Sequence, residues 1–265
     1  MSAIVRPSRA RIGGQTVPCP ARSRHPAGTI AGVTERPARL TAVLPALDEA
    51  VAIASVVRGC LTHADEVLVV DGGSRDATAE LATAAGARVV HEPRRGYGRA
   101  CATGAAAAQG ELLVFVDADG SLDPDDIPRV VAPVAAGALD LVLGARTRRP
   151  GNAMAPHLRL ANRVLGLAVR PACGRVLSDL GPLRAIRRET LAGLAVADLG
   201  FGWPLDMVLR AGRAGLRVGE VDVHFGPRLG GSSKATGSLR GLLRATRAMS
   251  VLLARDLTRR ATPPP

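Results

Sequence analysis

Two aspartates separated by one residue carry the strongest chemical signal in this sequence. Asp117 and Asp119 close the apolar run at residues 112–116, in the segment Val-Asp-Ala-Asp-Gly. Carboxylate oxygens at the end of a buried strand are hard ligands that suit Mg²⁺ or Mn²⁺ carrying a diphosphate. Taken alone, the motif is equally well explained as an ordinary turn rich in Asp and Gly. The rest of the chain therefore has to decide between a cation site and a turn.

Other polar residues follow the ends of other predicted strands. Asp48 and Glu49 come after the first strand, Asp71 after the second, and a basic loop at residues 92–99 after the third. Because open α/β sheets bind ligands beyond the carboxyl ends of their strands, these groups can share one ligand. An acceptor such as Asp71 can bind the N–H of uracil or guanine, nearby glycines allow close backbone approach, and arginines can neutralise a diphosphate. The glycines and arginines concerned are Gly72, Gly73, Arg94, Arg95 and Arg99.

Apolar runs alternate with helical patterns along most of the chain. The short, nearly all-apolar strands predict an α/β fold with a mostly parallel central sheet flanked by helices. The predicted strands are residues 40–44, 66–70, 87–91, 112–116, 140–144, 182–186 and 217–225. The predicted helices are residues 49–61, 75–85, 97–109, 125–136, 156–169, 203–214 and 239–257. We expect a disordered basic arm (1–38), one α/β domain (39–237), a basic amphipathic helix (238–260) and a disordered tail (261–265).

Composition narrows the class of partner. The chain has 265 residues, of which 47% are hydrophobic and 2% aromatic, so we expect one large domain with an aliphatic core. The net charge is +12, and because Lys234 is the only lysine, nearly all of the positive charge is arginine. A basic surface attracts nucleic acid, anionic lipid or phosphorylated ligands. With so few aromatic rings available to stack on bases, we predict no nucleic-acid partner.

Cysteine spacing and hydropathy suggest a compartment. Cys19, Cys60, Cys101 and Cys173 form no Cys-x-x-Cys pair, so we expect reduced thiols in a cytoplasmic protein. The sequence has no uncharged apolar stretch of about 18 residues, so no membrane span is predicted. An apolar signal region is also missing from the N-terminus.

In their order along the chain, these motifs resemble the family-2 glycosyltransferases of GT-A fold, from about Leu40 to Leu243. The matching segments are residues 44–49, 70–78, 96–100, 116–120, 179–186, 202–207 and 228–234. They look most like the branch of dolichyl- or polyprenyl-phosphate mannose and glucose synthases. The resemblance implies a GT-A nucleotide-diphospho-sugar transferase fold, a UDP- or GDP-sugar donor and a Mg²⁺ or Mn²⁺ cofactor.

The resemblance also implies roles at the donor. Asp117 and Asp119 would bind the cation and the sugar diphosphate, so Asp119 counts as catalytic. Arg228 and Lys234, in a Gly/Ser loop, would close over the phosphates as a lid. The nucleoside would be held by Pro45, Asp48 and Asp71. The other residues assigned to the donor are Glu49, Gly73 and Arg99.

Roles at the acceptor follow from the same resemblance. Arg146 matches the arginine that binds the acceptor phosphate in those relatives, and Asp179 and Arg184 belong to a matching segment assigned to substrate. Asp206 is the candidate base, although a first-turn acid favoured by the helix dipole explains it equally well. His224 is a candidate third metal ligand, with a purely structural histidine as the alternative.

The sequence departs from the family pattern in three ways. Asp48 stands where Asn is usual, and both can accept hydrogen bonds from a ribose. Asp206 stands where Glu is usual, which shortens the reach of a base by one methylene. The transmembrane helices that many relatives carry after this domain are missing from the sequence.

The predicted reaction is an inverting, metal-dependent transfer of a hexose, with a polyprenyl phosphate as the favoured acceptor. A phosphate oxygen is already an anion, whereas a hydroxyl acceptor would need a base such as Asp206. A sugar-phosphate nucleotidyltransferase is less favoured, because a Gly-rich, Lys-containing loop does not follow the first strand. A basic binding module without catalysis is supported by the charge alone.

Two basic amphipathic helices bear on the acceptor. In residues 156–169 the apolar side carries Leu158, Leu165 and Val169, with arginines around it, and residues 239–257 repeat the pattern. Such a helix can lie in a membrane interface, held by apolar contacts and anionic lipid. The alternative is that both helices pack on the sheet and leave their arginines in water. We expect a peripheral contact with the inner face of the plasma membrane.

Overall fold

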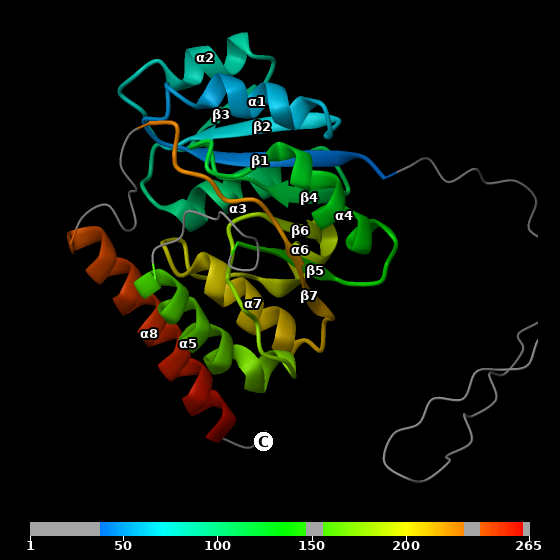
Figure 1. Ribbon diagram of the computed structural model, residues 1–265, viewed down its shortest axis with the longest axis vertical. Coiled ribbons are helices and arrows are strands. Elements are labelled where there is room, and N and C mark those ends of the chain that lie inside the picture. The colour runs from blue at the N-terminus through cyan, green and yellow to red at the C-terminus, as the bar shows by residue number, and fades with distance from the viewer. Residues whose placement is uncertain (1–37, 147–155, 231–238, 262–265) are drawn as a thin grey trace, which may run out of the picture. The chain divides into compact units, whose positions relative to one another are not determined.

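The computed structural model describes residues 38–146, 156–230 and 239–261, and their centre is a seven-stranded sheet in the order β3-β2-β1-β4-β6-β5-β7 (Figure 1). The strands are β1 Leu40–Ala46, β2 Glu66–Asp71, β3 Arg88–His91, β4 Leu112–Phe115, β5 Leu141–Ala145, β6 Arg184–Arg187 and β7 Val218–Asp222. Strand β6 runs antiparallel to both β4 and β5, and the other pairs are parallel. The predicted α/β fold with a mostly parallel sheet is confirmed.

Helices cover both faces of the sheet. They are α1 Ile53–Leu61, α2 Thr78–Ala84, α3 Tyr97–Ala107, α4 Ile127–Ala135, α5 Pro156–Cys173, α6 Arg188–Leu194, α7 Trp203–Arg213 and α8 Leu239–Ala261, with a 3-10 turn at Pro124–Asp126. Alternate residues of a strand point to opposite faces, which divides the core in two. On β1, Leu44 packs with α1 and α4 in one cluster, while Val43 packs with α3 and α7 in the other.

Some predicted boundaries were wrong for local reasons. Helix α1 begins at Ile53, not at residue 49, because Asp48 has a left-handed φ of 52° and the Glu49 carbonyl closes a turn on the N–H groups of Ala52 and Ile53. A residue with positive φ cannot continue into a right-handed helix. The short helix α6, which follows β6 directly, was not predicted, and β7 ends at Asp222, not at residue 225.

The two basic amphipathic helices exist, and both contact α7. The part of the predicted apolar face of α5 that carries Leu165 and Val169 packs against the core, as in the alternative, since Val169 is fully buried and Leu165 contacts buried residues. The apolar residues that α5 exposes are Leu160, Val164 and Leu167. In the described part of the chain, no helix is long and apolar enough to cross a membrane.

Several predictions lie outside the described residues. These are the basic arm up to residue 37, the loop at 147–155, the Gly/Ser loop at 231–238 with Lys234, and the tail from residue 262. The predicted roles of these segments, and the predicted domain boundaries, stay predictions.

Candidate active site

A cavity of about 1110 Å³ lies at the carboxyl ends of β1, β2 and β4 and extends to α7 and α8. Its walls come from the loops after these strands, from the segment 197–201 and from the two helices. Many of the predicted site residues line it, namely Pro45, Glu49, Asp117, Asp119, Arg146, Arg184, Asp206 and Arg228. The edge of the sheet where the motifs were expected to meet is therefore hollow.

The two aspartates after β4 differ in their surroundings. Asp119 is buried, and its Oδ1 accepts hydrogen bonds from the backbone N (2.9 Å) and Oγ (2.6 Å) of Ser121. Asp117 has a weaker partner, the hydroxyl of Tyr97 at 3.4 Å. Burial raises the pKa of Asp117 to about 6, and the negative charge of Asp119 adds to the rise. A cation near the pair would lower the free energy of the charged state.

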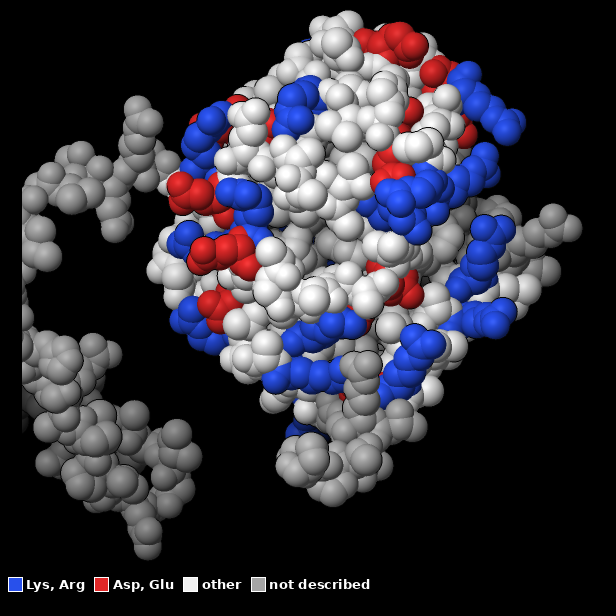
Figure 2. Space-filling view, turned by 180° about the vertical axis from the view of Figure 1, so that it is seen from behind, with Lys and Arg blue, Asp and Glu red and all other residues white. Residues whose placement is uncertain are grey.

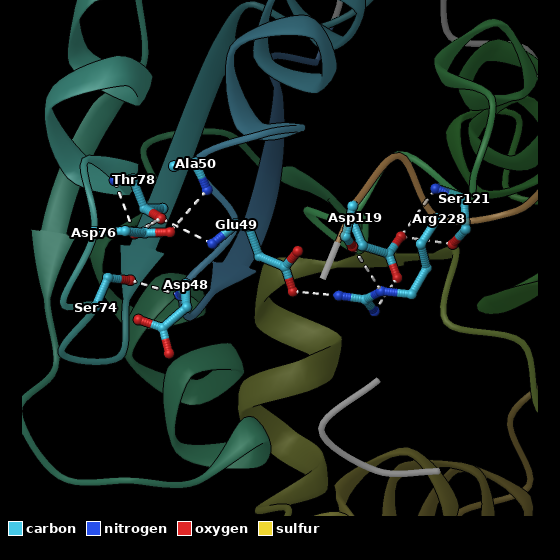
Figure 3. A network of polar contacts seen from close by, with 10 residues as sticks. Asp48, Glu49, Ala50, Ser74, Asp76, Thr78, Asp119, Ser121 and Arg228 are labelled. Carbon is cyan, nitrogen blue, oxygen red and sulfur yellow. Dashed lines mark hydrogen bonds and ion pairs between the residues drawn. The ribbon is translucent and has the colours of Figure 1, made fainter. Parts of the chain in front are cut away.

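Arg228 joins the loop after β1 to the loop after β4 (Figure 3). Its Nη1 lies 2.5 Å from Asp119 Oδ2, and its Nη2 lies 2.5 Å from Glu49 Oε1. The backbone allows this closure because Gly120 has a φ of 74° and a Cβ there would lie 2.6 Å from the Leu229 side chain. Asp119 is thus already paired with an arginine of the segment predicted to act as a lid.

The turns after β1 and β2 are joined by side chains (Figure 3). Asp48 donates its N–H to Ser74 Oγ at 2.9 Å, and its Oδ1 accepts the Arg75 N–H at 2.9 Å. The Glu49 N–H donates to Thr78 Oγ1 at 2.8 Å. These hydrogen bonds fix the turn after β1, which carries Asp48, to the turn after β2.

Three residues of the turns after β1 and β2 that were predicted to contact the donor do not line the cavity. They are Asp48, Asp71 and Gly73, whereas the neighbouring Leu47 and Gly72 do line it. Asp71 is buried, and its Oδ1 accepts the Ser74 N–H at 3.2 Å. Their contacts with a nucleoside stay predictions.

Arg146 forms an ion pair with Asp179. Its Nε and Nη2 donate to the two carboxylate oxygens at 2.8 and 3.0 Å, and its backbone N–H donates at 2.9 Å. Asp179 is fully buried and does not line the cavity. In this structure Asp179 holds Arg146, which does line the cavity, and a direct contact of Asp179 with substrate stays a prediction.

The side chain of Arg184 is buried and is held in place by backbone carbonyls. It is 0% exposed, and it donates to the carbonyls of Leu180 (2.8 Å), Gly181 (2.8 Å) and Pro204 (2.7 Å). Burial lowers the pKa of this guanidinium. These hydrogen bonds join the segment before β6 to the first turn of α7. The guanidinium also adds positive charge to the cavity wall.

Asp206 has both carboxylate oxygens engaged. Its Oδ2 accepts the N–H groups of Ala197 (2.7 Å) and Asp198 (3.1 Å), and its Oδ1 accepts Arg210 Nε at 2.8 Å. It lines the cavity, but it also fixes the 197–198 segment to α7. A residue with these bonds is poorly placed to take a proton, so the structure favours the structural explanation.

Two other predicted positions fall elsewhere. The Nδ1 of His224 lies 3.3 Å from Asp126 Oδ2 and 3.8 Å from Asp123 Oδ2, and the residue does not line the cavity, so its role as a third metal ligand stays a prediction. Arg99 does not line the cavity either, and its buried Nε has no hydrogen-bond partner among the described residues. Arg95 is the arginine of that loop that reaches the cavity.

Sequence reasoning missed the segment at residues 197–201, which forms one wall of the cavity. Asp198 Oδ1 accepts the N–H groups of Gly200 (2.8 Å) and Gly202 (3.1 Å). The carbonyl of Leu199 accepts the Arg99 N–H at 3.0 Å. The pattern Asp-x-Gly-x-Gly was its signal, because an acid before alternating glycines favours a loop closed on its own backbone.

Comparison with known proteins gives the class. Residues 41–192 match the model of glycosyl transferase family 2. An uncharacterized glycosyltransferase of Mycobacterium tuberculosis is 42% identical over 202 residues, which are 76% of this chain and 92% of that protein. The undecaprenyl-phosphate mannosyltransferase of Micrococcus luteus is 34% identical over 66% of this chain and 78% of its own length.

Solved structures share the fold. The glucosyl-3-phosphoglycerate synthase of M. tuberculosis, crystallised with Mn²⁺, UDP-glucose and phosphoglyceric acid, superposes with a TM-score of 0.67 at 27% identity. The superposition covers 83% of this chain and 79% of that one. The sheet and its cavity thus define a GT-A glycosyltransferase fold, as predicted. The chain belongs to the family-2 glycosyltransferases.

Proposed function

We propose that this glycosyltransferase moves a hexose from a nucleotide-diphosphate sugar to the phosphate oxygen of a polyprenyl phosphate, with inversion at the sugar. The observation that carries the proposal is the continuous cavity from the strand ends to α8. One end has Pro45, Gly72 and the two aspartates, and the other has arginines beside apolar residues of α7 and α8. This pairing suits a polar donor and an anionic acceptor with a hydrocarbon chain.

The donor side fits a divalent cation. No group of three or more His, Cys, Asp or Glu side chains in the described part of the chain could hold a metal ion by itself. Mg²⁺ typically binds through one or two carboxylates plus substrate phosphates. We assign this role to Asp119 and Asp117, and a bound Mg²⁺ or Mn²⁺ would supply charge stabilisation for the leaving diphosphate. Arg228, which already contacts Asp119, would add its positive charge to the same phosphates.

The acceptor side fits a nucleophile that needs no base. Asp206 is occupied by three hydrogen bonds, so it is a weak candidate for accepting a proton from a hydroxyl. Arg146 uses Nε and Nη2 on Asp179, which leaves Nη1 for an acceptor phosphate. An ion pair on two of its nitrogens holds the guanidinium in one orientation, so less entropy is lost when a phosphate binds.

The exposed face of α5 supports a peripheral membrane contact. Leu160, Val164 and Leu167 are 64%, 58% and 51% exposed and follow helical spacing. Arg159, Arg163 and Arg170 are exposed on the same helix. An apolar stripe flanked by arginines can insert into the interface of an anionic bilayer. Replacing Leu160 and Leu167 by Ser should reduce co-sedimentation with phosphatidylglycerol vesicles, whereas Leu81→Ser, at an exposed position of α2, should not.

The function is tested by a transfer assay. Labelled UDP- and GDP-sugars are incubated with Mn²⁺ and undecaprenyl phosphate, 3-phosphoglycerate or a sugar alcohol. We expect transfer to undecaprenyl phosphate. Turnover on 3-phosphoglycerate or on the hydroxyl acceptor, with none on the lipid phosphate, would refute the proposed acceptor while leaving the donor chemistry intact.

A further inference from the structure

One face of α8 carries arginines and apolar residues in alternation. Its residues lie at intervals of three and four, so they form one stripe along the helix. The stripe lines a hollow of about 310 Å³ and consists of Arg244, Arg247, Ala248, Val251, Leu252 and Arg255. All of these except Arg247 and Val251 also line the main cavity, so the hollow adjoins its mouth.

Two arginines of this stripe, Arg244 and Arg247, differ from those deeper in the cavity. Arg146, Arg210 and Arg228 have carboxylate partners, and Arg213 pairs with Asp256. In the residues that the structure describes, neither Arg244 nor Arg247 has an ion pair or hydrogen bond. Figure 2 shows positive side chains along the edge of the molecule on which α8 runs.

Among the described residues that line the hollow, one acidic side chain stands against three arginines. Asp198 is the acidic residue that lines the hollow, and its Oδ1 is engaged with two backbone N–H groups. Val251 is 40% exposed between the arginines. Uncompensated guanidinium groups bind phosphate through charge-assisted hydrogen bonds, and neighbouring apolar side chains gain from contact with hydrocarbon.

We propose that the α8 stripe is an entry subsite for the acceptor, in which Arg244 and Arg247 bind its phosphate and Val251 and Leu252 contact the hydrocarbon chain next to it. The inference rests on the proposed function and adds a second anionic subsite to Arg146. The acceptor phosphate is first captured at α8 and then passes to Arg146, beside the aspartates. The recognised chemistry is a phosphate monoester joined to a prenyl chain.

The test measures binding without sugar transfer. A short-chain prenyl monophosphate, the matching prenyl alcohol and 3-phosphoglycerate are titrated by calorimetry into the full chain with UDP and Mn²⁺. Arg244→Glu and the double variant Arg244→Glu/Arg247→Glu are compared with Arg58→Glu, an exposed arginine of α1 outside both hollows. Arg244→Lys keeps the charge, and circular dichroism checks that each variant is folded.

We expect the prenyl phosphate to bind more tightly than the alcohol, and Arg244→Glu to weaken it about tenfold, as for loss of one charged hydrogen bond. The double variant should lose more, Arg244→Lys less, and Arg58→Glu nothing. Equal binding by Arg244→Glu and Arg58→Glu, or no phosphate binding, would overturn the subsite. Arginine-dependent binding of 3-phosphoglycerate alone would overturn the lipid assignment. If calorimetry shows this arginine-dependent binding but the transfer assay shows no sugar transfer to the lipid phosphate, the proposed function is refuted and the subsite is kept.

Discussion

The two halves of the cavity are built differently. The donor half, formed by the loops after β1, β2 and β4, is braced by hydrogen bonds between those loops, and the carboxylates of Glu49 and Asp119 are buried in it. The proposed acceptor half, formed by α7 and α8 with Arg146 at its inner end, has arginines on helix surfaces and, at its mouth, the exposed apolar residue Val251. The sheet therefore fixes the donor half and Arg146, whereas helix surfaces form the rest of the proposed acceptor half.

This difference explains how one fold serves several acceptors. Relatives named for undecaprenyl phosphate and for 3-phosphoglycerate match the same chain, and solved structures of the second kind hold UDP-glucose. A helix face can change its side chains without disturbing a strand, because substitutions at exposed positions cost little stability. Carboxylates at strand ends cannot change so freely, since their neighbours are buried and paired.

The largest expected effect is at the centre of the donor half. Asp119→Asn removes a charge that the proposed cation and the Arg228 contact both need, so Mn²⁺-dependent UDP binding should fall more than about hundredfold, beyond the loss typical of outer-shell changes. Asp117→Asn should weaken it severely. Calorimetry checks this, with Asp125→Asn in the same loop as the control, because Asp125 is exposed. Unchanged Mn²⁺-dependent binding in both variants would move the cation site elsewhere.

A second prediction compares two ion pairs of the same form. Asp179 accepts the N, Nε and Nη2 groups of Arg146, and Asp140 accepts the same three groups of Arg217, but on the surface. Asp179→Ala leaves a largely buried guanidinium without its partner and should reduce the free energy of unfolding by about 3–5 kcal/mol. Asp140→Ala should cost about 0–1 kcal/mol.

Urea denaturation measures both variants, and the transfer assay separates stability from function. Asp179→Ala should also raise the KM for the acceptor, because Arg146 loses its fixed orientation, whereas the affinity for UDP should not change. Equal stability losses in the two variants would mean that burial does not distinguish the pairs.

A smaller effect is expected at the nucleoside. Asp71→Ala removes one predicted hydrogen bond to a base, worth about 0.5–1.5 kcal/mol, so UDP affinity should fall up to about tenfold. The fold should persist, since the Asp71 side chain bonds the Ser74 N–H at the edge of a turn. Wild-type UDP affinity in this variant would limit Asp71 to holding that turn.

Sequence patterns predicted the strands well because burial on both faces leaves a continuous apolar run, as in β4. The motifs at strand ends were found for the same reason, since strand direction fixes where they meet. Side-chain partners were not predictable: Arg228 lies 109 residues from Asp119, and Asp179 lies 33 residues from Arg146. Pairs so far apart leave no periodic pattern in the sequence. The burial of Asp179 and Arg184 and the position of His224 could therefore be seen only in the structure.

The smallest expected effect tests whether the acceptor half contains a base. Asparagine at position 206 keeps an oxygen for the N–H groups of Ala197 and Asp198 and loses the partly exposed ion pair with Arg210, which costs about 1 kcal/mol of stability or less. If the acceptor is a phosphate, Asp206→Asn should change the transfer rate by less than about threefold, since no protein base is needed. The rate should fall in both proteins as pH drops below about 6, where the dianion of a phosphate monoester takes up a proton and becomes the less nucleophilic monoanion, and should be flat above pH ~7. A rate measured from pH 5 to 9 that falls a hundredfold or more in Asp206→Asn, with the pH dependence of the wild type lost, would show that Asp206 accepts a proton. The acceptor would then be a hydroxyl, and the arginines of α8 would need another ligand.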